Sequence, residues 1–461
     1  MTEKQKDLLV DNPTGQDDVF AGLLESDLQV GRLNTLSDPE SGDTIIAETG
    51  NDQFTEDALK QQSERWQKYL GSIEGEADNA ESESKYRVAR KKMAEIALLN
   101  AMIGQVKTDI DSSDEIDRHE SELYGHYDDD LYKAALAQKI RQIEQLPIGG
   151  DPNLETARAD LLDTLDKLVG NDRGNIAEIA EPTSETLQQI GQWLSDEHVN
   201  TIMLIDSFEN DTLSADSIKQ VFEDAIARND ALRELGWRVE IVDREKQAIS
   251  VYASERKIVV PSKRQATKAA LKKTSIHEYY HALRSANAEM SGNIVGRFGT
   301  ADYPSFEESF MIALEQCLEG KYDPKRGIDH YVTIGLSATS KLPREEIARI
   351  TQSMKQLEKS DNGISDDAVE AAKRLTGVQI KRTFAGMTDV DDGIAHKKDI
   401  DYYHGINNAW KLLNELTEKG IVKEGLAWVM AAKFNPFIKQ ERELIEKYHP
   451  MPKELQDFFS D

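Results

Sequence analysis

Thr274-Ser-Ile-His-Glu-Tyr-Tyr-His-Ala-Leu-Arg284 is the stretch of sequence around which the rest of the chain is organised. It contains His277-Glu278-x-x-His281, a spacing that places two imidazoles one helical turn apart on the same face of a helix. A Zn²⁺ bound by two neutral imidazoles and a third protein ligand can accept a water molecule and lower its pKa. Glu278 can then take the proton. The stretch therefore predicts metal-assisted peptide hydrolysis, with Glu278 as the general base.

The flanking residues favour a helix. Thr267 can cap its start, and apolar residues recur at helical spacing on a stripe that excludes both histidines: Ala270, Leu271, Ile276, Tyr280 and Leu283. The alternative is an accidental motif, in which the histidines and the glutamate are surface or capping groups of an ordinary helix.

A third ligand is expected from the segment Pro304–Glu315, which reads as a helix that continues to Leu318 and stops at Gly320. We choose Glu308, because a site of two histidines alone would bind Zn²⁺ poorly. Glu307 is the neighbouring contender. Ser305-x-x-Glu308 is also the pattern of a capping box, in which the glutamate only satisfies backbone N–H groups.

The composition excludes some classes of partner. The 461 residues include 85 Asp plus Glu against 56 Lys plus Arg, a net charge of −29, and 39% are hydrophobic, which is enough for a core. An acidic surface of this kind repels phosphate backbones and anionic lipids. We therefore expect neither nucleic acid nor membrane as a partner.

A single cysteine, Cys317, rules out a disulfide within the chain and fits a reducing compartment. The first residues lack the basic start and apolar run of a signal peptide, and no apolar stretch approaches the length of a membrane span. We therefore expect a cytoplasmic protein.

Three regions are predicted along the chain. Residues 1–55 read as an acidic, disordered tail, in which Phe20–Leu24 could be a short docking motif. Residues 56–200 read as a helical N-terminal region. Residues 201–461 read as a zincin-like catalytic region whose C-terminal part is helical. Beyond those already named, helices are expected at about 86–103, 129–145, 154–169, 174–195, 214–235, 343–375 (two helices), 401–418 and 422–447.

Three short segments before the histidine motif read as strands: Trp237–Val242, Ala248–Tyr252 and Lys257–Val260. Polar turns separate them, which suggests an antiparallel meander. The predicted fold class is thus α+β and predominantly helical, with a zincin-like core in which a small antiparallel or mixed sheet packs on the motif helix. An exposed edge strand could pair with an extended peptide and lay its carbonyl over the metal.

Six segments carry a resemblance to a known family: Glu122–Gly125, Trp237–Asp243, Ile249–Tyr252, His277–Asn287, Glu307–Glu308 and Lys398–Gly405. In these segments the chain resembles the microtubule-associated tyrosine carboxypeptidase family, whose bacterial members are called flavohaemoglobin expression-modulating proteins with a QEGLA motif. The resemblance covers roughly residues 60–450. It implies a zinc carboxypeptidase that removes a C-terminal residue, in eukaryotic members the tyrosine of tubulin tails. It also implies His277, His281 and Glu308 as ligands and Glu278 as base.

Two positions depart from that family. Its motif is H-E-x-x-x-H, whereas His277 and His281 are one residue closer together, at the ordinary zincin spacing. The QEGLA position reads Glu307-Glu308-Ser-Phe-Met311, and a literal Glu424-Gly-Leu-Ala427 occurs much later in the chain. A carboxylate seven residues after Glu308, Glu315, is similar to the ligand helix of gluzincin aminopeptidases; it would support His277 or His281, or be an exposed helix residue.

A carboxypeptidase also needs a cation for the terminal carboxylate of its substrate, a peptide or protein tail. Arg284, Arg382 and Lys398 are the candidates, and each could instead form a structural or surface ion pair. Possible donors to the oxyanion are Tyr402, Tyr403, His404 and His330. Two other functions remain open: an endopeptidase or aminopeptidase with the same zinc site, and a degenerate enzyme that acts as a binding or regulatory protein.

Overall fold

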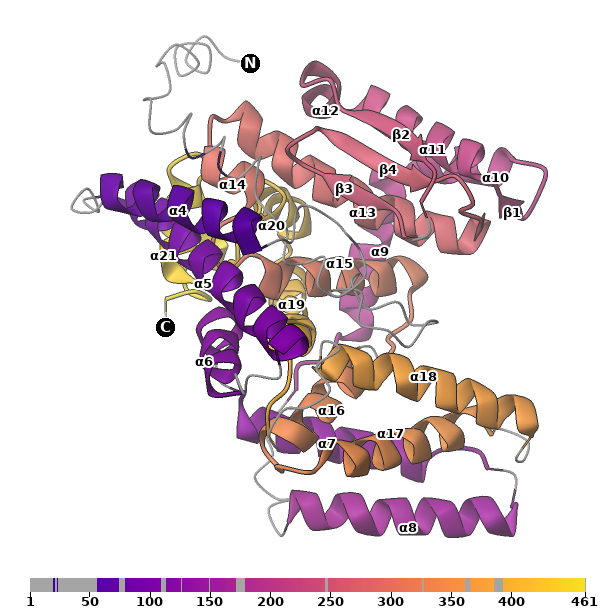
Figure 1. Cartoon of the computed structure of the whole chain (residues 1–461). Coiled ribbons are helices and arrows are strands. Elements are labelled where there is room, and N and C mark those ends of the chain that lie inside the picture. Colours follow the sequence, from indigo (N-terminus) through magenta and orange to yellow (C-terminus); the bar gives the residue numbers. More distant parts are fainter. Residues whose placement is uncertain are drawn as a thin grey trace.

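A computed structural model describes Phe20, Leu23 and residues 56–73, 79–108, 113–125, 127–148, 150–170, 179–244, 248–325, 327–360, 365–384 and 393–460. Helices dominate these residues, as the sequence predicts, and two small sheets, one of three strands and one of two, lie toward one edge of the molecule (Figure 1). Among the described helices, none combines the length and the apolar character that crossing a membrane requires.

The three-stranded sheet has the strand order β2-β4-β3, from β2 (Arg238–Val242), β3 (Ser250–Tyr252) and β4 (Lys257–Pro261). β3 and β4 are antiparallel, but β2 and β4 are parallel, so the predicted antiparallel meander is wrong and the sheet is mixed. Strand periodicity reports which face is buried and carries little information on pairing. The strand with the longest apolar run, β4, takes the central position, where both of its edges are paired.

The histidine motif lies on α13 (Lys268–Met290), which begins as predicted: the Thr267 side chain accepts a hydrogen bond from Ala270 N. Just before it, β5 (Ala266–Thr267) pairs with β1 (Thr212–Leu213). Buried residues of this helix belong to both hydrophobic clusters that the described residues form. Leu271, Ala282 and Ala286 belong to the cluster of the sheet, and Ile276, Tyr280 and Ala288 to the larger helical cluster.

Helices α10 (Val199–Ser207), α11 (Ala215–Arg228) and α12 (Asp230–Glu234) complete the sheet cluster. Ser214 caps α11, but the single helix predicted over 214–235 is two helices. Asn229 separates them, because its side chain accepts a hydrogen bond from Leu232 N at 3.0 Å and so starts a new helix.

At the centre of the helical part lies α15 (Pro304–Glu319), which ends at Gly320 in the left-handed region, as predicted. It packs against α9 (Ser184–Glu197) and α19 (Ile400–Glu418). The α9 contact is tight: a Cβ on Gly191 would lie 2.2 Å from the carbonyl oxygen of Cys317. The helix predicted over 174–195 begins later, at Ser184, where the Thr183 side chain accepts a hydrogen bond from Thr186 N; residues 171–178 lie outside the described residues.

Five helices form a bundle on one side of α15 (Figure 1): α7 (Asp129–Glu144), α8 (Pro152–Val169), α16 (Ile328–Ala338), α17 (Arg344–Lys359) and α18 (Asp366–Phe384). Lys139 is fully buried in this bundle and donates to Asp329 at 2.5 Å and to Glu358. The ion pairs join α7 to α16 and α17.

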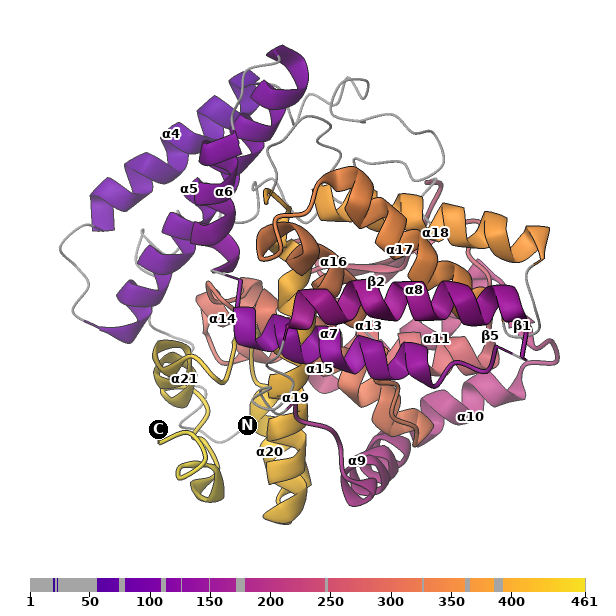
Figure 2. The ribbon, with the colours of Figure 1, turned by 90° about the horizontal axis from the view of Figure 1, so that it is seen from below.

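Three N-terminal helices lie side by side at another edge of the molecule (Figure 2): α4 (Glu56–Ile73), α5 (Ala80–Thr108) and α6 (Ser113–Tyr124). α5 continues beyond Gly104, where the sequence predicted its end. Phe20 and Leu23 are helical and buried, and the Phe20 ring centroid lies 5.4 Å from that of Tyr69 on α4. The rest of the predicted tail lies outside the described residues.

The C-terminal helix predicted over 422–447 is also divided, into α20 (Val422–Val429) and α21 (Lys439–Glu446). Pro436 lies between them, in a segment whose backbone cannot continue the helix. Residues 430–435 of this segment contact α13, and the short helix α14 (Ile294–Phe298) lies beside them. The described residues also include two 3₁₀ turns, η4 (Lys397–Asp399) and η5 (Lys453–Leu455).

Candidate metal centre

His277 and His281 come together on one face of α13, with ring centroids 4.8 Å apart. Glu308 approaches them from α15. His277 Nε2 lies 3.6 Å from Glu308 Oε2, and His281 Nε2 lies 3.5 Å from Glu308 Oε1. The three residues form the one His, Cys, Asp or Glu group in the described part of the chain that could hold a metal ion, with ligand atoms within 4.8 Å of one another.

The two separations between Glu308 and the histidines approach those of metal ligands. Zn²⁺ in a tetrahedral site lies about 2.0–2.1 Å from nitrogen and oxygen ligands, which places neighbouring ligand atoms about 3.3–3.4 Å apart. The two observed separations to Glu308 are close to that value. The structure brings Glu308, the ligand expected from the sequence, together with the two histidines, and Glu307 does not belong to this group.

The capping-box interpretation of Glu308 does not fit. Tyr303 occupies the cap position of α15 and makes no side-chain cap hydrogen bond. Ser305 lies inside the helix, where its hydroxyl donates to the Asp302 carbonyl at 2.7 Å. Glu308 is consequently not needed to satisfy the helix terminus.

Each histidine is held from behind by a carboxylate. His277 Nδ1 donates to Glu315 Oε1 at 2.9 Å, and His281 Nδ1 lies 3.0 Å from Glu307 Oε1. The hydrogen bond to Glu315 fixes the ring orientation and tautomer of His277, and Glu307 places its charge beside Nδ1 of His281, which leaves both Nε2 atoms facing Glu308. The sequence proposed Glu315 for this role; Glu307, proposed as a ligand, holds the second ring instead.

Two buried cations surround Glu307. Arg284 Nη1 lies 3.6 Å and Lys433 Nζ 3.7 Å from its Oε1. Burial alone would raise the pKa of Glu307, but the charges of Lys433, His281 and Arg284 outweigh it and hold that pKa far below its usual range. The carboxylate that supports His281 is therefore ionised.

Glu308 and Glu278 differ in their surroundings. Burial raises the pKa of Glu308, but the hydrogen bond from His277 and the charge of His281 lower it to about 2. Burial raises the pKa of Glu278 above its ordinary value, with the two histidines opposing the shift. Glu278 is half-buried beside the two histidines, where its carboxylate could accept a proton.

Arg284, a candidate for the substrate carboxylate, is fully buried. Its guanidinium donates to the carbonyl oxygens of Ala432 at 2.8 Å and Phe434 at 2.9 Å. Asn287, one turn further along α13, donates to the Met430 carbonyl at 2.9 Å. Arg284 therefore ties α13 to the segment after α20 in addition to facing Glu307.

The other two cations lie near η4. Arg382 donates to both carboxylate oxygens of Asp399, at 2.9 and 2.7 Å. Lys398 is half-buried; burial lowers its pKa, while the charges of Asp399, Glu95 and Glu308 oppose the shift. Arg284 is fully buried, and Arg382 forms a bidentate ion pair with Asp399. Lys398 is half-buried, and the charge of Glu308 acts on it. It is therefore the candidate best placed to meet a substrate.

The candidate oxyanion donors are mostly engaged elsewhere. Tyr403 is buried and donates to Gln138 Oε1 at 3.0 Å. His404 Nε2 lies 2.9 Å from the hydroxyl of Tyr331, and His330 Nδ1 lies 3.6 Å from Asp399. The side chain of Tyr402 lies outside the described part.

Sequence reasoning missed three contributors. Lys433 comes from the segment after α20, Tyr303 from the start of α15, and Glu95 from α5. Glu307, Glu95 and Glu308 are among the charges that act on Tyr303, whose pKa burial raises strongly. Tyr303 could have been suspected because it lies four residues before Glu307 in the sequence. No pattern in the neighbouring sequence indicates Lys433 or Glu95.

Comparison with known proteins adds no assignment: no protein-family model matches this chain, and no curated protein matches it.

Proposed function

We propose that this protein is a zinc-dependent metallopeptidase that removes a C-terminal residue from a peptide or protein tail. The observation that carries the proposal is the spacing of His277 Nε2, His281 Nε2 and the Glu308 carboxylate, with Glu278 beside them. Three nitrogen and oxygen ligands with one open position are typical of catalytic rather than structural zinc sites.

When bound, the metal would act as a Lewis acid that activates a water molecule and polarises the substrate carbonyl. His277, His281 and Glu308 would hold it, and Glu315 and Glu307 would keep the two imidazoles in orientation. Glu278 would accept the proton of the attacking water and deliver it to the leaving amine. Burial of Glu278 suits this exchange, because it brings the pKa of the carboxyl upward.

The carboxypeptidase specificity rests on Lys398. Its half-buried ammonium group lies within electrostatic reach of Glu308, where it could bind the terminal carboxylate of a substrate. The edge strand β3, which has contacts with α13 and pairs only with β4 among the described strands, could bind the extended backbone of the tail. A preference for tyrosine follows from the family resemblance alone.

A binding protein on a degenerate peptidase fold is the rival that the site argues against. Loss of catalysis would leave the ligands and Glu278 free to change, and here all four residues are in place.

Cys317 is buried and free, which fits a reducing compartment, and on that ground we propose a cytoplasmic location.

The test is hydrolysis of matched peptides by the zinc-loaded protein, using one sequence with an acetylated N-terminus and a free carboxylate, and the same sequence amidated. We expect release of the last residue from the acid and no cleavage of the amide, with Glu278→Gln reducing the rate at least about 100-fold.

Other outcomes discriminate the alternatives. Internal cleavage of the amidated peptide would indicate an endopeptidase, and a requirement for a free N-terminus an aminopeptidase. No cleavage of any peptide in a set that varies the C-terminal residue, tyrosine included, would contradict hydrolysis and leave the binding protein.

A further inference from the structure

The 3₁₀ turn η4 carries Lys398, the residue on which the proposed carboxypeptidase specificity rests. Lys398 is half-buried, and the carboxylates whose charges act on it come from η4 itself, from α5 and from α15: Asp399, Glu95 and Glu308. In the described part of the chain, its ammonium group has no hydrogen bond or ion pair that would fix it. The position of this cation therefore depends on the turn that carries it.

The two neighbours of this cation in η4 are held by different helices. Asp399 is buried and accepts two hydrogen bonds from the guanidinium group of Arg382 on α18, at 2.9 and 2.7 Å. Lys397 is also buried, and its ammonium group donates to the Asp117 carboxylate on α6 at 2.8 Å. The turn is thus tied to α18 by its last residue and to α6 by its first.

A buried carboxylate, Glu120 of α6, makes the third tie. Its Oε1 lies 2.6 Å from Nδ1 of His396, the residue before η4, and its Oε2 accepts a hydrogen bond from the backbone N–H of Lys397 at 2.8 Å. His396 is buried as well, and its backbone N–H donates to the Thr383 carbonyl at the end of α18 at 2.7 Å. Burial of a carboxylate costs free energy that an apolar side chain would not, so these contacts favour a role in fixing the geometry of the turn.

We propose that Glu120 is a positioning residue for the substrate: it holds η4 so that Lys398 meets the terminal carboxylate of the peptide. This role rests on the proposed function of the metal centre. It gives α6, in the N-terminal region, a part in substrate selection. Because a displacement of about 1 Å weakens a contact of this kind, loss of the tie should reduce the preference for a peptide acid over its amide and leave the metal in place.

The experiment measures binding, so it requires no turnover. The parent protein is the full-length, zinc-loaded Glu278→Gln variant, which lacks the proposed base. The probe is rhodamine-labelled Gly-Ala-Ala-Ala-Tyr with a free carboxylate, compared with the same peptide amidated, and fluorescence anisotropy gives both affinities. We expect the parent to bind the acid at least about tenfold more tightly than the amide, and Lys398→Met to abolish this preference.

Glu120→Gln keeps the size of the side chain but presents an amide N–H group to one of the two donors of the turn. The preference for the acid should fall at least about fivefold, with the zinc content unchanged. In the Lys398→Met background the same substitution should not change the preference further, since its effect passes through that lysine. Asp117→Asn, at a half-exposed position where folding is not at risk, should lower the preference about threefold.

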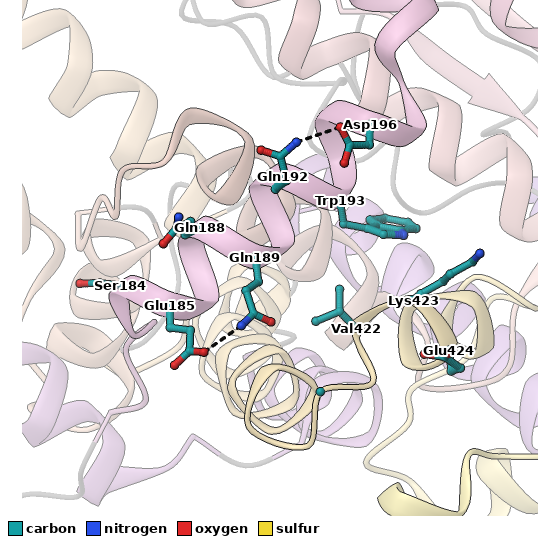
Figure 3. A pocket seen from close by; sticks show the side chains of 11 residues that line it. Ser184, Glu185, Gln188, Gln189, Gln192, Trp193, Asp196, Val422, Lys423 and Glu424 are labelled. Carbon is teal, nitrogen blue, oxygen red and sulfur yellow. Dashed lines mark hydrogen bonds between the residues drawn. The ribbon is translucent and has the colours of Figure 1, made fainter.

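The matched control is Glu185→Gln on α9. Glu185 is an exposed carboxylate that accepts a hydrogen bond from Gln189 at 2.8 Å (Figure 3). It lines a hollow between α9 and α20 to which none of the metal ligands contributes. The control makes the same chemical change as Glu120→Gln away from the site, and it should leave the preference within about twofold.

The outcomes separate this role from the proposed function. A parent without the preference, whether it binds both peptides equally or neither at about 1 mM, would contradict the carboxypeptidase and the role of Glu120 with it. A parent that prefers the acid, with an unchanged preference in Glu120→Gln and Asp117→Asn, would overturn the role of Glu120 alone. A preference that survives Lys398→Met, or that Glu120→Gln changes further in that background, would also overturn it.

Discussion

At the scale of single residues, the candidate metal centre depends on which atom of each imidazole is occupied. Glu315 and Glu307 take the Nδ1 atoms, so both Nε2 atoms face Glu308. A histidine without such a contact can rotate or change tautomer, and the metal site then has to order it on binding. The carboxylates behind the histidines should therefore contribute to metal affinity although they do not face the metal.

Glu315→Gln tests this contribution, because the substitution keeps the size of the side chain and removes its charge. We expect the zinc affinity to fall about tenfold, measured by competition with a fluorescent zinc chelator. Glu319→Gln, one turn further along α15 on a side chain paired with Lys273, is the matched control and should change little. Equal affinities in the wild type and in Glu315→Gln would contradict the role given to Glu315.

His198 is a second residue whose environment gives a measurable prediction. It is buried at the junction of α9 and α10, its Nε2 lies 2.8 Å from the Tyr280 hydroxyl, and burial lowers its pKa to about 4. The unfolded chain takes up a proton near pH 6.5 and the folded chain does not, so stability is present above pH 6.5 and is lost as the pH falls towards 4.

From pH 7 to pH 5, His198 should remove about 2 kcal/mol from the free energy of unfolding. His198→Gln, which can still bond Tyr280, should show a loss smaller by that amount in urea titrations at the two pH values. The same loss in both proteins would mean that His198 is not held neutral.

Some residues of the candidate site could be predicted from the neighbouring sequence, and others could not. His277, Glu278 and His281 could be predicted because one helix fixes their spacing, and Glu308 and Glu315 because a second helix does the same. The contacts of Arg284 with Ala432 and Phe434, and of Lys433 with Glu307, join distant segments. No spacing rule links such residues, so sequence reasoning assigned Arg284 to substrate and did not find Lys433.

At the scale of helices and strands, α15 is positioned by close contact on two sides. Gly191 on α9 and Gly405 on α19 both lie directly against the backbone of α15. A Cβ on Gly191 would be 2.2 Å from the Cys317 carbonyl oxygen, and a Cβ on Gly405 would be 2.3 Å from the Ser305 carbonyl oxygen. Because a backbone carbonyl cannot move without shifting the helix, these glycines set the separation of the three helices and so the position of Glu308.

Gly191→Ala should destabilise the protein by about 1–3 kcal/mol, since the added methyl group must push α9 and α15 apart. Gly71→Ala is the matched control: Gly71 is exposed on α4 and a Cβ there meets nothing within 4 Å. It should stabilise by up to about 1 kcal/mol through helix propensity. Urea unfolding midpoints measure both, and a neutral Gly191→Ala would show that the contact is looser than described.

The elements predicted correctly are those with a clear period or a clear end signal. Thr267 begins α13 and Gly320 ends α15, as expected. The errors arose where local signals were weak or misread: Asn229 and Pro436 divide segments that have helical periodicity on both sides. The parallel pairing of β2 with β4 could not be predicted, because pairing depends on which strand fits the centre of the sheet.

At the scale of the whole molecule, the larger hydrophobic cluster draws on residues from Phe20 to Phe459 and so crosses the boundary expected near residue 200. The smaller cluster contains the sheet, and α13 contributes to both. The predominantly helical class with a small sheet follows from composition and periodicity. The contact of the segment after α20 with α15 does not, because it joins Lys433 to Glu307, which are far apart in the chain.

The charge of the whole chain predicts a salt effect. A net charge of −29 opposes the compact state by self-repulsion, and salt screens it. The melting temperature should rise as NaCl increases from about 10 to 150 mM, over which the Debye length falls from about 30 to 8 Å. A constant or falling melting temperature over this range would mean that local ion pairs outweigh the net repulsion.

The most direct test of the metal centre is the zinc content of the purified protein by elemental analysis, in the wild type and in three variants. We predict about one zinc per chain in the wild type and in Glu278→Gln, and a loss of zinc in His281→Ala and Glu308→Ala, because only the latter two remove a ligand. A wild-type protein that holds no zinc even after zinc is added back would contradict the account, as would full retention of zinc by Glu308→Ala.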